Sequence, residues 1–390
     1  MQRQITPTIN VELAYLGNKG THVFAGNGPA YNTNEPAIGS GTDAYTCLAP
    51  GAPGNPNATQ FDCTAKFVPS ILQSWRRRLF LSGIPAFTYG APYNYTCCAV
   101  DVGNYFGNDA SSHYNAFQIK VEKRFSEGLQ FLTHYTYSKT YNYNNDYLAV
   151  SPRFAYGPDD FSRNNVWVMS VVYELPFGQG KKYLSGLSRP MNFLVGGWQV
   201  SNTTNWSGGL PFTPTLGHCG EISDLNNDVG HCRPNLVPGQ GISVGKTTNS
   251  KGIFWFNTVS SLDQSPQVFS NTDITGLDAC TLARPTSGPV ALPACGTLGN
   301  AGRNSLRGPR AFSSDLSVLK NFSITERIKA QFRFDAYNVF NHPILGFNSS
   351  QGNTCIDCAG AGQITAIEAD ASPNAPNGMR QLQFGLRATF

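Results

Sequence analysis

The sequence predicts an all-β fold, and more narrowly a portion of an antiparallel transmembrane β-barrel with long extracellular loops. Three observations lead to this class. The 390-residue chain is rich in turn formers and aromatic residues, with 40 Gly, 25 Pro and 12% Phe, Trp and Tyr. Several segments of about ten residues alternate apolar and polar side chains, as membrane-spanning strands do. The connections between these segments alternate between short and long, which is the layout of membrane barrels.

The clearest alternation lies at the C-terminus, in residues 380–390, and it recurs in residues 328–337. Successive side chains of a strand point to opposite faces, so one set is expected to face lipid and the other the lumen. The expected lipid-facing residues are Phe332, Phe334, Leu382, Phe384, Leu386 and Phe390. The expected lumen-facing residues are Gln331, Arg333, Asp335, Gln383 and Arg387.

Further strands follow from the same period of two, some of them weaker. They are expected near 8–16, 21–30, 117–121, 129–138, 167–175, 193–207 and 313–324. Together with the two C-terminal strands they make about nine. Trp167, Trp198 and Trp206 sit towards strand ends, where an aromatic girdle would lie.

The connections are expected to place short turns in the periplasm and long loops outside the cell. The expected short turns are Gly17–Gly20, Ser126–Gly128 and Thr325–Glu326, with a longer connection from Pro176 to Pro190. The expected long loops run at about 31–112, 142–163, 208–312 and 342–379.

Ten cysteines lie in the long connections, and eight of them form near neighbours in sequence. Local disulfides are the natural interpretation, and they imply an oxidising compartment. The expected pairs are Cys47 with Cys63, Cys219 with Cys232, Cys280 with Cys295, and Cys355 with Cys358. Sequence alone does not fix this connectivity, and Cys97 and Cys98 have no obvious partners.

Charge and motifs argue against several classes of function. Charged residues make up 13% of the chain with a formal net charge of +4, and no basic stripe indicates a nucleic-acid partner. No Ser/His/Asp, paired-carboxylate or phosphate-loop arrangement stands out. We therefore expect neither an enzyme nor a cofactor.

Three motifs leave other chemistry open. Cys355 and Cys358 have the spacing of a redox pair, but they lie in a Gly- and Asn-rich loop rather than at a helix N-terminus. The residues His218, Cys219, His231 and Cys232 are all possible zinc ligands, although their spacing matches no ordinary finger. Oxygen ligands at every second position from Asp224 to Asp228 resemble a calcium loop that lacks its glycine.

Four stretches resemble the closing strands of TonB-dependent receptors of the Oar-like type: residues 299–309, 315–322, 331–343 and 380–390. Earlier stretches fit as well, at 114–125, 135–139, 174–178, 197–199 and 207–213. The likeness covers nearly the whole chain.

This resemblance implies a barrel of roughly 22 strands with an N-terminal plug. It implies energy-coupled uptake of a scarce small ligand, with outer-membrane lipid around the barrel and TonB as a partner of a full-length parent. It further implies that the last strand, ending in Phe390, engages the barrel assembly machinery. Residues 1–390 would then be the C-terminal part of the barrel, without the plug.

The N-terminus carries no secretory signal, since Met1 to Pro7 lead directly into strand-like sequence. We therefore expect the chain to start partway through a longer one. About nine strands would leave an open sheet with unpaired edges at 8–16 and 380–390, so the chain alone is expected not to insert stably. The alternatives are a passive porin, a surface adhesion barrel, or a secreted soluble β-sandwich that binds carbohydrate.

Overall fold

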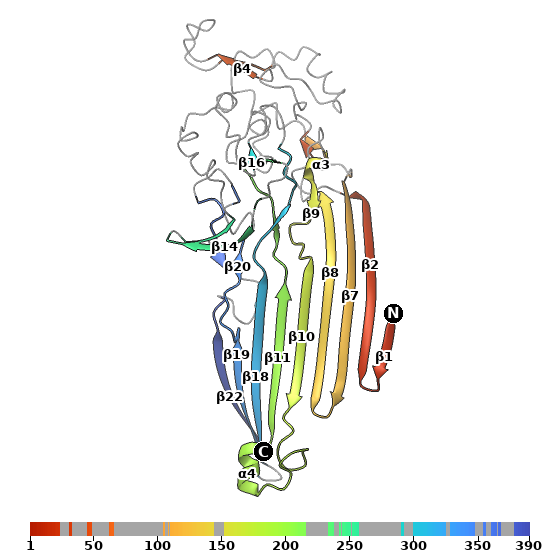
Figure 1. The fold of residues 1–390 in the computed structure, drawn as a ribbon, viewed down its shortest axis with the longest axis vertical. Coiled ribbons are helices and arrows are strands. Elements are labelled where there is room, and N and C mark those ends of the chain that lie inside the picture. Colours follow the sequence, from red (N-terminus) through yellow and green to blue (C-terminus); the bar gives the residue numbers. More distant parts are fainter. Residues whose placement is uncertain are drawn as a thin grey trace.

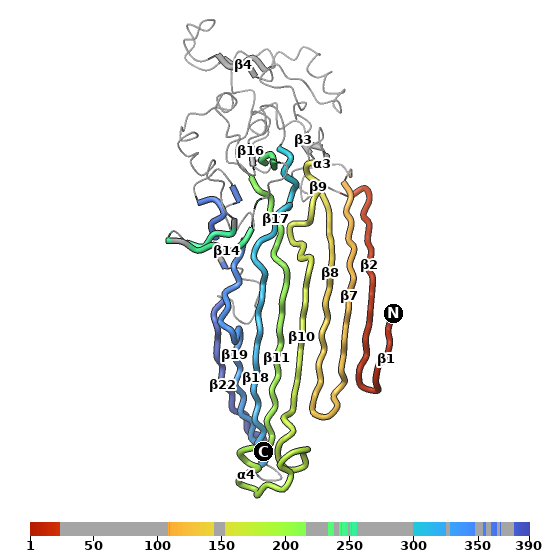
Figure 2. The backbone as a smooth tube through the Cα atoms, viewed as in Figure 1, coloured from red at the N-terminus to blue at the C-terminus, as the bar shows by residue number. Residues whose placement is uncertain are grey.

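The computed structural model describes most of the strand-forming sequence and part of the connections. The described residues are 1–23, 31–32, 45–48, 62–65, 104–105, 108, 110–143, 152–215, 233–237, 242, 244–250, 252–256, 290–291, 299–324, 328–347, 354–355, 360–364, 366–367 and 378–390. Their main feature is one tall antiparallel sheet (Figure 1). Its strands lie side by side from β1 at one edge to β22 at the other, and β9 pairs with β8 outside this row (Figure 2).

Nine strands form the row, as the alternating segments predict. In order they are β1 (Gln2–Thr6), β2 (Ile9–Val23), β7 (Ala110–Ser126), β8 (Leu129–Tyr143), β10 (Asn165–Glu174), β11 (Trp198–Ser207), β18 (Ala311–Ser323), β19 (Lys329–Tyr337) and β22 (Gln381–Thr389). Every neighbouring pair is antiparallel, so β1 and β22 run in the same direction. Within the described residues the row does not close into a barrel.

The two ends of the sheet differ in their connections, as predicted. At one end, here called the short-turn end, the strands are joined through 7–8, 127–128, 175–197 and 324–328. At the other, the long-loop end, they are joined through 24–109, 144–164, 208–310 and 338–380. Among the described residues, no helix is long and apolar enough to cross a bilayer.

The turn expected at Gly17–Gly20 is wrong. Strand β2 runs straight through these residues, and Gly17 pairs with Asn115 while Gly20 pairs with Ser112. A Cβ on Gly20 would lie 2.5 Å from the Ser112 hydroxyl, so this glycine permits close approach of the neighbouring strand and makes no turn. The turn lies at residues 7–8, where the Thr6 hydroxyl accepts a hydrogen bond from the Ile9 amide at 3.1 Å.

This correction reverses the first predicted strand and moves one edge of the sheet. The segment 8–16 is not an unpaired edge, because β2 pairs with β1 on one side and β7 on the other. Of the segment expected as a strand at 21–30, residues 21–23 belong to β2 and the remainder lies outside the described residues. The row still contains the expected nine strands, because β1 takes the place of the expected second strand. The C-terminal edge at β22 is where the sequence predicts it.

Short strands and two short helices lie at the ends of the row. The remaining strands are β3 (Tyr31–Asn32), β4 (Tyr45–Leu48), β5 (Asp62–Ala65), β6 (Asn104–Tyr105), β9 (Tyr156–Pro158), β12 (Pro211–Phe212), β13 (Asn235–Leu236), β14 (Val244–Asn249), β15 (Gly252–Phe256), β16 (Val290–Ala291), β17 (Leu306–Arg307), β20 (Leu345–Gly346) and β21 (Ala366–Ile367). The described helices are α3 (Pro152–Ala155) and α4 (Arg189–Val195). Helix α4 occupies the start of the strand expected at 193–207, with Pro190 in its first turn, where proline fits a helix best.

A buried apolar cluster lies at the long-loop end. It contains Phe212, Phe347 and Ala361, with Trp255 and Leu306 packed against it. These residues come from two connections, 208–310 and 338–380, so the bases of these two long loops are packed together. We call this region, with the polar residues that surround it, the loop-base cluster.

Candidate functional site: the two faces of the sheet

The register of β19 and β22 places the two sets of predicted residues on opposite faces. Phe332 pairs with Leu386 and Phe334 with Phe384, and the rings of the second pair lie 5.1 Å apart. On the other face, Gln331 pairs with Arg387 and Asp335 with Gln383. Arg333 shares that face and donates a 2.8 Å hydrogen bond to Asp335. Leu382 lies on the face of Phe384, and Phe390 follows the end of β22.

The face that carries Phe334, called the apolar face, continues across the whole sheet. Near the long-loop end, Tyr135, Trp167, Trp206 and Phe312 are successive cross-strand partners in β8, β10, β11 and β18. Near the short-turn end, Trp198 begins β11 on the same face. Trp198 and Trp206 lie roughly 27 Å apart along the strand, at about 3.4 Å per residue. An apolar band between aromatic girdles is about 25 Å tall in membrane barrels.

The polar side chains within this band hydrogen-bond to one another. Asn202 donates to the Ser314 hydroxyl at 2.8 Å, and the Thr204 hydroxyl donates to the Asn202 side-chain oxygen at 2.7 Å. Nearby, the Trp167 indole donates to the Thr133 hydroxyl at 2.8 Å. Thr204 and Ser314 are buried. Mutual pairing of this kind is what hydrocarbon requires, because it offers no water to an unpaired polar group.

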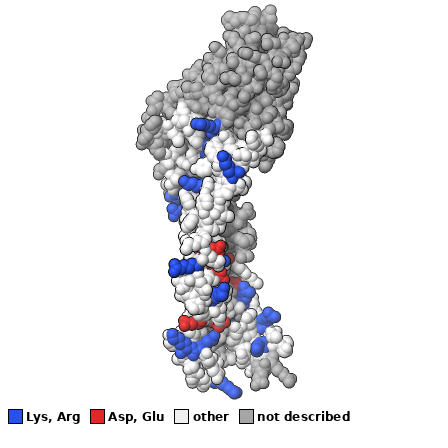
Figure 3. All heavy atoms as spheres, turned by 90° about the vertical axis from the view of Figure 1, so that its right-hand side faces the viewer, with Lys and Arg blue, Asp and Glu red and all other residues white. Residues whose placement is uncertain are grey.

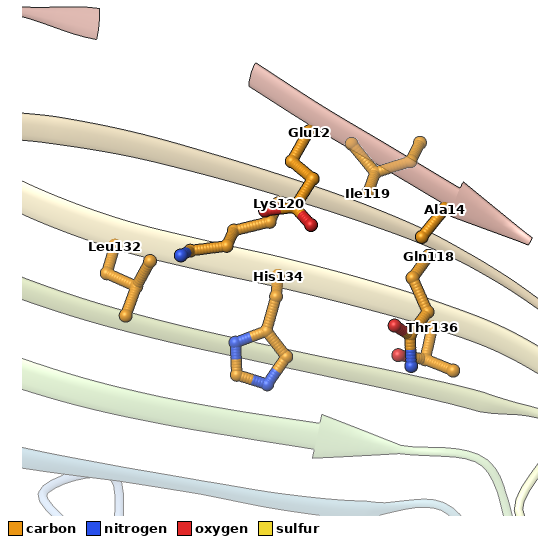
Figure 4. Close-up of a pocket in the computed structure, with 8 residues that line it drawn as sticks. All are labelled: Glu12, Ala14, Gln118, Ile119, Lys120, Leu132, His134 and Thr136. Carbon is orange, nitrogen blue, oxygen red and sulfur yellow. The ribbon is translucent and has the colours of Figure 1, made fainter. Parts of the chain in front are cut away.

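The opposite face, called the polar face, carries charges. A hollow of about 200 Å³ crosses β2, β7 and β8 there. Figure 4 shows Glu12, Lys120 and His134 lying along it, and these three residues are successive cross-strand partners. Lys120 also forms a 3.4 Å ion pair with Glu122, and both side chains are exposed. Both charge signs together suit a hydrated surface.

The loop-base cluster is anchored by arginines that the sequence analysis did not single out. Arg303 is buried and donates to the Asn142 backbone and side-chain oxygens at 3.1 and 2.9 Å. It also donates to Asp160 at 2.8 Å, and Asn304 donates to the same carboxylate at 2.6 Å. These contacts join the 299–309 segment to Asn142 at the end of β8 and to Asp160 in the connection between β8 and β10.

Arg307 repeats this anchoring four residues later in the sequence. It donates to the Asn164 side-chain oxygen at 2.8 Å and to the Ser162 carbonyl. Burial lowers the pKa of the Arg307 guanidinium from its ordinary value, while the Tyr141 phenol opposes the shift. Three glycines permit the close packing, since a Cβ on Gly209, Gly299 or Gly157 would meet backbone oxygen at 2.5 Å or less. In the sequence, the arginines and glycines of 299–309 are the signal that could have indicated this packing.

Of the predicted disulfides, the structure bears on two. Cys47 and Cys63 are Cα partners across β4 and β5. Directly opposed residues of antiparallel strands lie about 4.5 to 5.5 Å apart, within the range of a disulfide. Cys355 is disulfide-bonded beside Thr215. Cys97, Cys98, Cys219, Cys232, Cys280, Cys295 and Cys358 lie outside the described residues, so the pairings stay predictions.

The motifs that left metal binding open also lie outside the described residues. These are His218, Cys219, His231 and Cys232, and the calcium-like stretch from Asp224 to Asp228. Within the parts of the chain that the structure does describe, no group of three or more His, Cys, Asp or Glu side chains gathers as metal ligands would.

A family model described as an outer membrane beta barrel domain matches residues 1–383, which is almost the whole chain. No curated protein and no solved structure matches the chain.

Proposed function

The chain belongs to the outer membrane beta barrel domain family and resides in the outer membrane, and on that premise we propose that it forms part of the wall of a ligand-uptake receptor of the TonB-dependent, Oar-like type. In this proposal the apolar face meets lipid and the polar face lines the lumen. The long-loop end lies outside the cell and the short-turn end in the periplasm.

The observation that carries the proposal is the division of one sheet into two chemically distinct faces. Phe332, Phe334, Leu382, Phe384, Leu386 and Phe390 are lipid-facing in this assignment, and Gln331, Arg333, Asp335, Gln383 and Arg387 are lumen-facing. A soluble sandwich would cover its apolar faces with a second sheet. In the described residues the apolar face is covered by no second sheet, and its polar groups are paired as lipid requires.

The loop-base cluster supports a receptor over a passive porin. A receptor must hold its long loops in a defined arrangement to capture a scarce ligand, and preorganised loops lose less entropy on binding. Arg303 and Arg307 tie the loop bases to one another by hydrogen bonds between residues more than 140 positions apart. We propose that the ligand is a small molecule captured above this cluster.

Three further roles belong to the same proposal. The last strand, ending at the exposed Phe390, would engage the barrel assembly machinery. TonB would act on a full-length parent rather than on this wall. We also propose that the chain is not an enzyme, because capture and passage of a ligand require no bond to be made or broken.

Uptake by cells that express the parent protein tests the proposal. Cells are offered labelled candidate ligands, namely iron siderophores, glycan fragments and peptides, with and without a protonophore. We expect saturable uptake of one class that stops when the protonophore is added. Uptake that persists without the proton gradient and does not saturate would favour a passive porin, and cell adhesion without uptake would favour an adhesion barrel.

A further inference from the structure

We propose that the connection between β10 and β11, residues 175–197, is a membrane anchor that binds anionic phospholipid in the inner leaflet. This inference rests on the proposed function, because it requires the apolar face to meet lipid. We call these residues the α4 segment. All of them are described by the structure, and Figure 1 shows α4 at the short-turn end of the sheet.

Helix α4 packs against the apolar face of the sheet. The ring of Phe193 in α4 lies 4.8 Å from that of Phe322 in β18. The Trp198 indole donates a 3.0 Å hydrogen bond to the Leu194 carbonyl at the end of α4. By strand register, Trp198 and Phe322 both belong to the apolar face. The helix therefore lies on the outer side of the wall, at the level of the membrane surface, and not below the lumen.

Lys320 holds the helix in this position. Its side chain is only 2% exposed, although it lies on the apolar face. Its ammonium group donates to the Leu194 carbonyl at 3.0 Å and to the Gly196 carbonyl, and it lies 4.9 Å from the centre of the Trp198 ring. Carbonyl groups at a helix C-terminus carry partial negative charge and attract a cation. The α4 segment is thus fixed to the wall.

The outer surface of the α4 segment is apolar. Leu194 is 64% exposed and Met191 is 48% exposed, although both lie in a helix that packs on the sheet. Tyr183, Leu184 and Phe193 are also exposed. Apolar side chains gathered on a short surface segment mark an interaction site. Here the site is continuous with the apolar face, which already meets hydrocarbon in the proposed function.

The charge of the segment identifies the lipid. It contains Lys181, Lys182 and Arg189 and no acidic residue. Lys181 forms a 2.8 Å ion pair with Glu174 at the end of β10. Among the described residues, no carboxylate pairs with Lys182 or Arg189, and Figure 3 shows Lys and Arg side chains at this end of the molecule. Apolar side chains beside basic ones fit an interface of acyl chains and anionic headgroups. The partner is therefore phospholipid with a net negative headgroup.

Photocrosslinking tests this inference in the parent barrel that contains residues 1–390, because the chain alone is expected not to insert stably. A benzoylphenylalanine residue replaces Leu194 in the α4 segment, Phe384 on the apolar face or Gln383 on the polar face. Each protein is reconstituted from detergent into nanodiscs of phosphatidylcholine, alone or mixed with phosphatidylglycerol, in which both lipids carry the radiolabel. We expect lipid adducts at 194 and 384 but not at 383. One cation near an anionic surface changes binding by about fivefold, so the yield at 194 should rise at least about fivefold with phosphatidylglycerol.

The matched variants remove three charges each. Lys181→Gln with Lys182→Gln and Arg189→Gln should make the yield at 194 equal in the two lipid mixtures. The control, Lys19→Gln with Arg153→Gln and Lys246→Gln, removes three exposed cations nearer the long-loop end and should keep the preference.

The possible outcomes separate the two proposals. Adducts at 384 without adducts at 194 overturn the anchor and leave the lipid-facing wall intact. Adducts at 383 in place of 384 overturn the assignment of faces, and with it the anchor, which requires the apolar face to meet lipid. Equal yields at 194 in both lipid mixtures overturn the part of the inference that names anionic lipid.

Discussion

The apolar face and the loop-base cluster treat large side chains in opposite ways. On the apolar face Phe384 and Leu386 expose 67% and 80% of their surface, whereas in the loop-base cluster Phe212 and Phe347 expose 1% and 3%. The first region is held together by backbone ladders and leaves its side chains to the surroundings. The second has a core of its own, surrounded by buried arginines. The two regions of one chain therefore suit different surroundings: the sheet suits lipid, and the loop-base cluster suits water.

The largest expected effect comes from a charge placed on the apolar face. Phe384→Arg should cost about 2 to 4 kcal/mol of membrane stability, because the strand centre lies in hydrocarbon. Gln383→Arg on the neighbouring position of β22 should cost much less, since the lumen is hydrated. Heat-modifiable migration and resistance of the parent barrel to urea extraction measure both. Equal losses for the two variants would remove the chemical distinction between the faces.

The loops should depend on covalent links that the sheet does not need. Pairing of Cys47 with Cys63, of Cys219 with Cys232 and of Cys280 with Cys295 is worth roughly 3 kcal/mol each in the chain-entropy model. Thiol labelling of unreduced, denatured protein should find these six cysteines blocked. Reduction should expose the loops to protease while the strands stay protected. Free thiols at Cys219 and Cys232 would instead support metal binding there.

Removal of a buried anchor tests whether the loop-base cluster behaves as a water-soluble core. Arg303→Met should destabilise it by about 2 kcal/mol, because the Asn142 carbonyl loses a charged donor, while the exposed side of Asp160 remains hydrated. Arg310→Met, at an exposed site in the same connection, is the control and should have little effect. Urea unfolding can be followed by the fluorescence of Trp255, whose indole donates to the Arg307 carbonyl. A matching loss in both variants would refute the anchoring role.

The smallest expected effect concerns the polar groups within the apolar face. Thr204→Val removes hydrogen bonds to Asn202 and Ser314, and a hydrogen bond between side chains in a membrane protein is worth about 0.6 kcal/mol on average. Thr203→Val, one position away on the polar face, serves as the comparison. Thermal aggregation in detergent ranks the two. A loss of several kcal/mol for Thr204→Val would mean that these side-chain hydrogen bonds stabilise strand pairing far more than this average.

The faces of the sheet were predictable from sequence because a strand's period of two is a local property. Phe334 and Phe384 could be assigned to one face before any pairing was known. What lay beyond prediction depends on distant residues. At position 20 a Cβ would collide with Ser112 of another strand. The position of α4 depends on its hydrogen bond to Lys320 of β18. Arg303 showed no pattern by itself, since its partners lie in β8 and in the connection between β8 and β10.

The common direction of β1 and β22 limits how the ring around the lumen can be completed. Copies of this nine-strand row related by rotation about the membrane normal would meet with β22 of one beside β1 of the next, both pointing the same way. Every such seam would be parallel, whereas membrane barrels alternate throughout. An odd number of intervening strands restores the alternation at both edges. Rotational symmetry between copies of this row alone is therefore excluded as the route to a closed antiparallel pore.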